Sequence, residues 1–259
     1  MKLDYDDKLF GESASCAGTL ALNLGVGLAL CALLLLMASG IGVRLGAWHF
    51  RTGFTILKYA AYGGGAAILM TLTAIVLAIK EGKSIGLVAV LVAVAMAIAA
   101  VGIPWQLKRT AERLPRIHDI STDLDNPPAF VAVPPLRRGD DNPVAYGGAE
   151  VADKQRLAYP DLKPAFVELP ADQAFARALA AAHRLHWEIV AEEPAEGRIE
   201  ATDMTFWFGF KDDIVIRLTP AGNRTRVDIR SLSRVGVSDV GTNARRVRDY
   251  LRMLSSLSP

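Results

Sequence analysis

The chain has 259 residues, of which 51% are hydrophobic, and its 29 Lys and Arg nearly balance its 27 Asp and Glu. A mean hydropathy of +0.26 is high for a soluble chain and low for one that lies wholly within a membrane, so a membrane part joined to a soluble part fits best. Up to Leu107 lie 7 basic and 5 acidic residues, which leaves 22 of each beyond it, and this neutral soluble part argues against a nucleic-acid partner.

Three stretches without charged residues fill the first 107 residues, and each is at least 20 residues long. A helix of about 20 apolar residues crosses the ~30 Å hydrocarbon core and satisfies every backbone group within its own segment. We therefore predict a transmembrane domain over residues 1–107, with the lipid bilayer as its partner. Small side chains and the lack of charge in mid-span favour a helical bundle over a transporter. The expected spans are 17–40, 54–79 and 85–105.

Three spans would place the N-terminus and the soluble part on opposite faces of the membrane. An acidic tail before the first span argues against a cleaved signal peptide, so this span should remain as an anchor. Basic residues beside the spans are fewer on the N-terminal side, and this count alone favours a cytoplasmic soluble part. The residues counted are Lys2, Lys8, Lys80 and Lys83 on the N-terminal side, and Arg44, Arg51, Lys58, Lys108, Arg109, Arg113 and Arg116 on the other.

Residues 108–169 form a proline-rich strap. Eight of the 13 prolines lie between Pro115 and Pro164, among Gly-Asp-Asp-Asn-Pro and Tyr-Gly-Gly turns. Proline removes a backbone donor and fixes φ, so we expect an irregular, extended linker here rather than regular structure.

Residues 170–259 are expected to fold as a soluble α+β domain. Apolar residues at helical spacing after Pro170 indicate a first helix, and a second helix closes the domain after an N-cap at Ser238 or Asp239. The order α-β-β-β-β-α indicates an antiparallel four-stranded sheet with both helices on one face. In the last two strands Ile and Leu would face one side, and Arg and Asp the other. The strands are expected at 187–192, 198–205, 213–219 and 224–231.

A dense polar run joins the last strand to the last helix. It reads Arg230-Ser231-x-Ser233-Arg234-x-Gly236-x-Ser238-Asp239-x-Gly241-x-Asn243-x-x-Arg246 and resembles the hallmark of a bacterial and plastid family, the domain of unknown function 1499. Phe210-Lys-Asp-Asp213 and Asp119-Ile-Ser-Thr-Asp123 are similar to two further segments of that family, so the resemblance covers about residues 116–256. The chain departs from the family in having no cysteine in the family's usual Cys-containing entry motif, and in carrying Val215 and Ile216 where a Glu often follows the Asp pair.

The resemblance implies that the soluble part is a domain of this family. It implies no reaction, because the family has no established activity. Relatives with export or lipoprotein signals imply a bacterial inner-membrane protein whose soluble domain is extracytoplasmic. This indication opposes the count of basic residues, and of the two we follow the family.

Two interpretations fit the polar run. In the first, glycines permit the turn, Ser238 and Asp239 cap the helix, and Arg234 pairs with Asp239 or Asp213, so the run is structural. In the second, several donors around the helix start form a binding site for phosphate or carboxylate. The binding residues would then be Arg230, Ser233, Arg234, Ser238, Asp239, Asn243 and Arg246.

Other chemistry is weakly indicated. His183 and His186 could hold a metal with Glu188, but no third ligand at helical spacing follows, so surface histidines are expected. Asp212 and Asp213 fit a turn and a salt bridge better than an acid/base pair. The sequence lacks a nucleophile elbow, a phosphate loop and a dinucleotide fingerprint, and both cysteines lie at the first span.

The sequence thus favours a membrane-anchored, non-enzymatic module that binds or scaffolds a partner membrane protein, a lipid headgroup or a small anion at the membrane surface, without a metal or a cofactor. The alternative is a membrane-tethered hydrolase that uses the turn from Arg230 to Asn243. Catalysis needs a nucleophile, a base or a metal arranged together, and no such set can be named from the residues.

Overall fold

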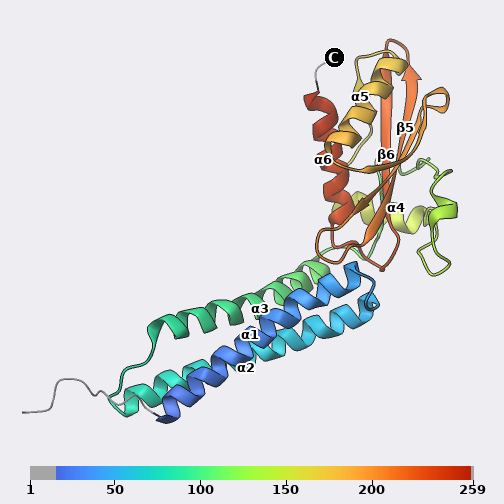
Figure 1. Cartoon of the computed structure of the whole chain (residues 1–259). Coiled ribbons are helices and arrows are strands. Elements are labelled where there is room, and N and C mark those ends of the chain that lie inside the picture. Colours follow the sequence, from blue (N-terminus) through green and yellow to red (C-terminus); the bar gives the residue numbers. More distant parts are fainter. Residues whose placement is uncertain (1–15, 258–259) are drawn as a thin grey trace, which may run out of the picture. The chain divides into compact units, whose positions relative to one another are not determined.

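The computed structural model describes residues 16–257, and the chain divides into two compact units, Met1–Lys108 and Arg109–Pro259 (Figure 1). The first unit contains α1 (Cys16–Arg44), α2 (Phe50–Lys80) and most of α3 (Leu87–Arg113). All three helices are long and apolar enough to cross a membrane, as the three expected spans require. The acidic tail before α1, on which the expected retention of the first span rests, lies outside the described residues.

Small side chains let the helices of this unit approach closely. Ala29 and Ala67 are fully buried in a shared apolar cluster. A Cβ added to Gly64 would come within 3.0 Å of the backbone oxygen of Ala97, so a side chain there would push α2 and α3 apart. The helices also run past most of the predicted span ends, because polar residues outside an apolar stretch can continue the same backbone hydrogen bonding.

The second unit is built on a six-stranded antiparallel sheet, which corrects the predicted four-stranded one. The two additional strands are β1 (Asp119–Ser121) and β2 (Ala165–Val167), which come from the strap and pair with opposite ends of β6. Three residues are too few to show the alternation by which a strand is recognised, and the prediction missed both for this reason. The predicted runs form β3 (Glu188–Glu193), β4 (Arg198–Met204), β5 (Lys211–Ala221) and β6 (Arg224–Ser233).

Two helices cover one face of the sheet, as predicted. Figure 1 shows α5 (Ala171–Arg184) and α6 (Thr242–Ser256) on the same side of the strands. Their apolar side chains join Ile214 and Ile216 of β5 in a single hydrophobic core. Trp187 stacks on Tyr250 of α6, with ring centroids 5.3 Å apart.

The strap contains regular structure that the sequence did not indicate. Its helix α4 (Gly148–Ala158) places Gln155 beside β1, where the side-chain amide accepts the backbone N–H of Ser121 at 3.0 Å and donates to its backbone oxygen at 2.6 Å. Gln155 therefore satisfies the backbone N–H and C=O of Ser121, as a neighbouring strand would. Two 3-10 turns complete the unit, η1 (Pro134–Leu136) in the strap and η2 (Pro194–Glu196) between β3 and β4.

The second face of the sheet carries the Arg and Asp side chains that the alternation predicted. Residues 122–147 of the strap, which we call the covering loop, lie across this face and contact it through side chains and backbone. Glu200, Asp213, Asp228 and Arg230 of the sheet are therefore buried between the strands and the covering loop rather than exposed to solvent.

Candidate functional site

The polar run of β6 and α6 does not converge on one site. Alternation along β6 sends Arg230 and Arg234 to the face under the covering loop, whereas Ser231 and Ser233 face α6. The seven predicted binding residues thus divide between a cluster on each face and the turn that joins β6 to α6.

Arg230 is enclosed beneath the covering loop. Its guanidinium donates to the carboxylate of Asp119 at 2.9 and 2.7 Å, and to two backbone oxygens of the covering loop at 3.1 and 2.7 Å. The rings of Phe130 and Tyr146 lie 5.1 and 5.4 Å from it, and burial, reinforced by Asp119, raises the pKa of Tyr146 to about 12. The Arg230 side chain is 3% exposed, so an outside anion could reach it only by displacing Asp119.

Asp213 binds two arginines from different segments. Its fully buried carboxylate accepts hydrogen bonds from Arg137 of the covering loop, from Arg234 at 2.8 and 3.0 Å, and from Thr202 of β4 at 2.8 Å. Burial alone would lower the pKa of Arg234, but the hydrogen bonds and charge of Asp213 raise it overall. Asn142 donates to the backbone oxygens of Ser233, at the end of β6, and of Gly236, in the β6–α6 turn, at 3.0 and 2.9 Å, and so ties the covering loop to that turn.

On the helical face, Arg246 bridges two carboxylates. It donates to Asp203 and to Asp212, each at 2.8 Å, and to the side-chain oxygen of Asn243 at 2.6 Å. Burial raises the pKa of Asp212, although Arg246 opposes the effect. Because two carboxylates share one guanidinium, the charge of Arg246 is already compensated within the unit.

Asn243 uses both ends of its amide. Its oxygen accepts from the hydroxyl of Ser231 at 2.7 Å, and its nitrogen donates to the hydroxyl of Ser233 at 2.9 Å and to the backbone oxygen of His118 at 3.0 Å. The contact with Arg246 confirms that these two residues, three positions apart, share one face of α6.

The β6–α6 turn places its own carboxylate at the start of α6. Asp239 accepts the backbone N–H groups of Gly241 at 3.1 Å and Asn243 at 2.6 Å, and Ser238 accepts that of Val240 at 3.2 Å. Gly241 has a φ of +78°, a conformation that glycine adopts readily. Asp239 thus stands where a bound anion would lie at this helix N-terminus.

Glu200 is a buried charged residue that the sequence did not reveal. Its two oxygens accept the backbone N–H groups of three consecutive residues of the covering loop, 131–133, at 2.8 to 3.0 Å, and it also pairs with Arg198. Glu200 lies between two apolar residues of an alternating strand, a pattern that usually indicates exposure. The one sign of this contact in the sequence is the apolar Val131-Ala132-Val133 of the strap, because an apolar segment is expected to pack against another part of the protein.

A buried carboxylate, Asp228, and a partly buried one, Asp123, share two arginines further along this face. Asp123 and Asp228 both accept hydrogen bonds from Arg217 and Arg226, at 2.8 to 3.2 Å. Burial would raise the pKa of Asp123, but the backbone N–H of Asn126 and the two arginines lower it overall.

A hollow of about 370 Å³ opens beside α6, and Arg246 is the one predicted binding residue that lines it. Trp187, Phe206 and Arg245 lie in its wall. Within residues 16–257, no group of three or more His, Cys, Asp or Glu side chains is arranged to hold a metal ion, and His183 and His186 belong to none.

Comparison with known proteins finds one family. A family model described as protein of unknown function (DUF1499) matches residues 119–254. Among solved structures, CalU16 from Micromonospora echinospora is similar at 16% identity over 36% of this chain and 73% of CalU16, with a TM-score of 0.26. No curated protein matches the chain.

Proposed function

The chain belongs to the DUF1499 family of proteins of unknown function, and we propose that it is a membrane-anchored, non-enzymatic module that binds or scaffolds a partner at the membrane surface. Three helices of membrane-spanning length and composition support the anchor. The observation that carries the rest is that the charged residues of the polar run are bonded to groups of the same module. A side chain engaged in this way must leave its partner before it can act as a nucleophile, a base or an anion ligand.

The seven predicted residues then have one shared task, which is to fix the β6–α6 turn against the covering loop and α6. A fixed turn gives the surfaces beside it a single shape, including the hollow next to Arg246. The partner that these surfaces would bind is a membrane protein, a lipid headgroup or a small anion. The residues with this task are Arg230, Ser233, Arg234, Ser238, Asp239, Asn243 and Arg246.

The substitution Arg234→Ala in the full chain distinguishes a structural role of the β6–α6 turn from a role in binding an anion. Removing one partner of a buried ion pair costs about 3–5 kcal/mol. Asp213 keeps Arg137 as a partner, so we expect the second unit to melt early, by an amount below that cost. Arg252→Ala, an exposed position on α6, is the control and should melt like the wild type. Circular dichroism gives the melting temperature, and calorimetry with inorganic phosphate gives binding. Loss of phosphate binding at an unchanged melting temperature would instead make the turn an anion site.

The hydrolase alternative has one observation in its favour. Asp212 binds Arg246, which lines the hollow. Burial raises the pKa of Asp212, as is common for acid/base residues. The purified chain should nevertheless turn over neither a simple ester nor a phosphate monoester. Turnover that disappears in Asp212→Asn while the melting temperature is kept would show that the protein is an enzyme.

We place the anchor in a bacterial inner membrane with the second unit on the extracytoplasmic side. This assignment follows the family resemblance rather than the count of basic residues. Reporter fusions before Met1 and after Pro259 should report opposite compartments if the chain has three spans, with the C-terminal reporter active outside the cytoplasm. Two reporters active in one compartment would contradict an odd number of spans.

A further inference from the structure

The loop between β4 and β5 turns apolar side chains toward solvent. It reads Met204-Thr-Phe-Trp-Phe-Gly-Phe210. Phe208 is buried and stacks on Phe210 with ring centroids 5.2 Å apart, whereas Phe206 is 93% exposed and Met204 is 43% exposed. The inner rings hold the loop in place while its outer side chains meet water, which is unfavourable for apolar surface.

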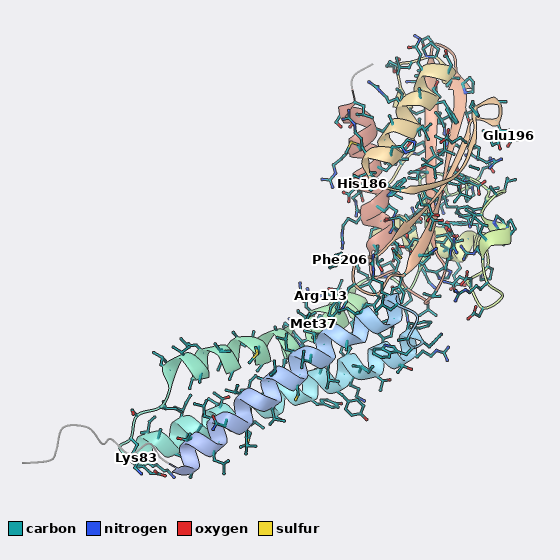
Figure 2. All side chains as sticks on the ribbon, viewed as in Figure 1. Met37, Lys83, Arg113, His186, Glu196 and Phe206 are labelled. Carbon is teal, nitrogen blue, oxygen red and sulfur yellow. The ribbon has the colours of Figure 1, made fainter. Side chains whose placement is uncertain are left out.

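This loop shares one end of the sheet with the β6–α6 turn and with the segment that precedes β1. β4 pairs with β5, and β5 with β6, whose last residue, Ser233, donates its backbone N–H to His118 at 2.9 Å. In the β6–α6 turn, Val237 is 64% exposed and adds a second apolar side chain at this end. Figure 2 shows Phe206 at this end of the unit, whereas Glu196 lies at the far end.

The same end of the sheet is connected to a candidate membrane span. Leu114–His118 alone separates the end of α3 from the start of β1, and such a segment reaches at most about 20 Å when extended. β4 is three strands away from β1 in the order β1-β6-β5-β4, which is roughly 15 Å across the sheet. The β4–β5 loop is therefore within reach of the bilayer that α3 would cross.

The chemistry of this end suits a lipid surface. Apolar side chains such as Phe are buried at the boundary between the headgroups and the acyl chains, and basic side chains are attracted to anionic lipids. Lys211 and Arg245 are both exposed here. We propose that Met204, Phe206 and Val237 enter the interfacial layer of the anionic membrane that anchors the chain. This proposal rests on the proposed function in requiring that the three helices cross that membrane.

A fluorophore placed at Phe206 tests the contact. The full chain, with Cys16→Ser and Cys31→Ser, carries Phe206→Cys labelled with an environment-sensitive dye. It is reconstituted into vesicles of phosphatidylcholine and phosphatidylglycerol that contain a spin-labelled lipid with the quencher near the headgroup. Emission should fall about twofold or more, because interfacial side chains lie about 5–10 Å deep, at the level of that quencher. Glu196→Cys should keep its emission, and Leu69→Cys in α2 should be quenched by a quencher deep in the acyl chains.

The controls separate failure of this proposal from failure of the anchor. Unquenched dye at position 206 with quenched dye at position 69 would overturn the lipid contact and leave the anchor intact. Met204, Phe206 and Val237 would then form a surface for a protein. Unquenched dye at both positions would mean that the helices do not lie in the bilayer, which would overturn the proposed function itself.

A second variant shows whether the Phe206 ring makes the contact. The dye is attached at Val237→Cys, and its quenching is compared with and without Phe206→Ser. We expect Phe206→Ser to remove most of the quenching at an unchanged melting temperature, because the ring is almost fully exposed. Phe166→Ser, which removes an exposed ring on β2 at the far end of β6, should leave the quenching unchanged. Equal quenching with and without Phe206→Ser would contradict the proposal.

Discussion

On one face of the sheet, Ile199, Ile214 and Ile229 pack with α5 and α6, whereas on the other face Glu200 and Asp213 lie under the covering loop. Both faces exclude water, but by different means. Burial of apolar area contributes roughly 25 cal/mol per Å² to stability. This contribution does not depend on one exact arrangement of side chains, so the helical face can tolerate a change of shape. A buried charge is stable only while its partners remain, so the charged face depends on each of its pairs.

This difference bears on how alternating strands are interpreted. Charged residues on alternate positions of a strand usually indicate a solvated face, and a cluster of them suggests a binding site. Here the same pattern forms the inside of a second layer, because the covering loop supplies Arg137 for Asp213 and three backbone N–H groups for Glu200. The arginines of the polar run are consequently part of the packing.

The largest expected effect comes from Asp213→Ala, which breaks the charged face at its centre. It leaves two buried guanidinium groups without their carboxylate and should lower the free energy of unfolding by about 3–5 kcal/mol. Ile216→Val, on the same strand but the opposite face, should cost about 0.5–1.5 kcal/mol. Urea unfolding of the full chain in detergent, followed by circular dichroism, measures both. Equal costs would mean that the two faces do not differ in this way.

A pair of substitutions at Arg230 and Asp119 sharpens the comparison. Arg230→Met and Asp119→Leu should each cost about 3–5 kcal/mol, because each leaves one buried charge alone. The double variant should be more stable than either single variant, since it turns this part of the charged face into apolar packing. Costs that simply add up would show that the two residues do not depend on each other.

A smaller effect is expected in the turn between the two faces. Gly241→Val should cost about 1–3 kcal/mol, because Gly241 has a φ of +78° and a Cβ there would come within 2.9 Å of Leu114. Arg245→Ala, an exposed change four residues on, should stay within about 0.5 kcal/mol. Equal melting temperatures for the two variants would mean that the turn accepts a β-branched residue.

The smallest effect is a difference in pH dependence between the faces. Asp123, on the charged face, has a lowered pKa, so its contribution is present above about pH 4 and is lost as pH falls through the folded value. Asp212, on the helical face, has a raised pKa, so its contribution is present below about pH 4 and is lost as pH rises through the folded value.

Asparagine substitutions isolate these two trends. Asp123→Asn should therefore cost more stability near neutral pH than in acid, and Asp212→Asn should cost less near neutral pH than in acid. Melting temperatures across the pH range measure both trends. Parallel trends in the two variants would contradict the opposite directions of the two pKa changes.

Charge-free apolar stretches were sufficient to predict the three helices of the first unit. Patterns of apolar residues were sufficient to predict α5, α6 and four of the strands. β1 and β2 could not be predicted, because each gains its stability from β6 rather than from a pattern of its own. The sequence shows the polar run itself but cannot identify all of the partners of its residues. Arg234 pairs with one of the two partners expected for it, 21 residues away, whereas Arg230 pairs with Asp119 at a separation of 111 residues, and nothing local indicates such a distance.

The position of β6 also sets the order in which the second unit can form. β6 is the last strand to be synthesised, yet β1 and β2 both need it as their neighbour. During translation, the strap is made long before the strand that will hold it, and its carboxylates remain hydrated in the meantime. Contacts between residues so far apart in sequence form slowly, so the unit should close in one late step once residue 233 has left the ribosome. A nascent chain stopped before Arg224 would then have a complete anchor attached to a segment that has not folded.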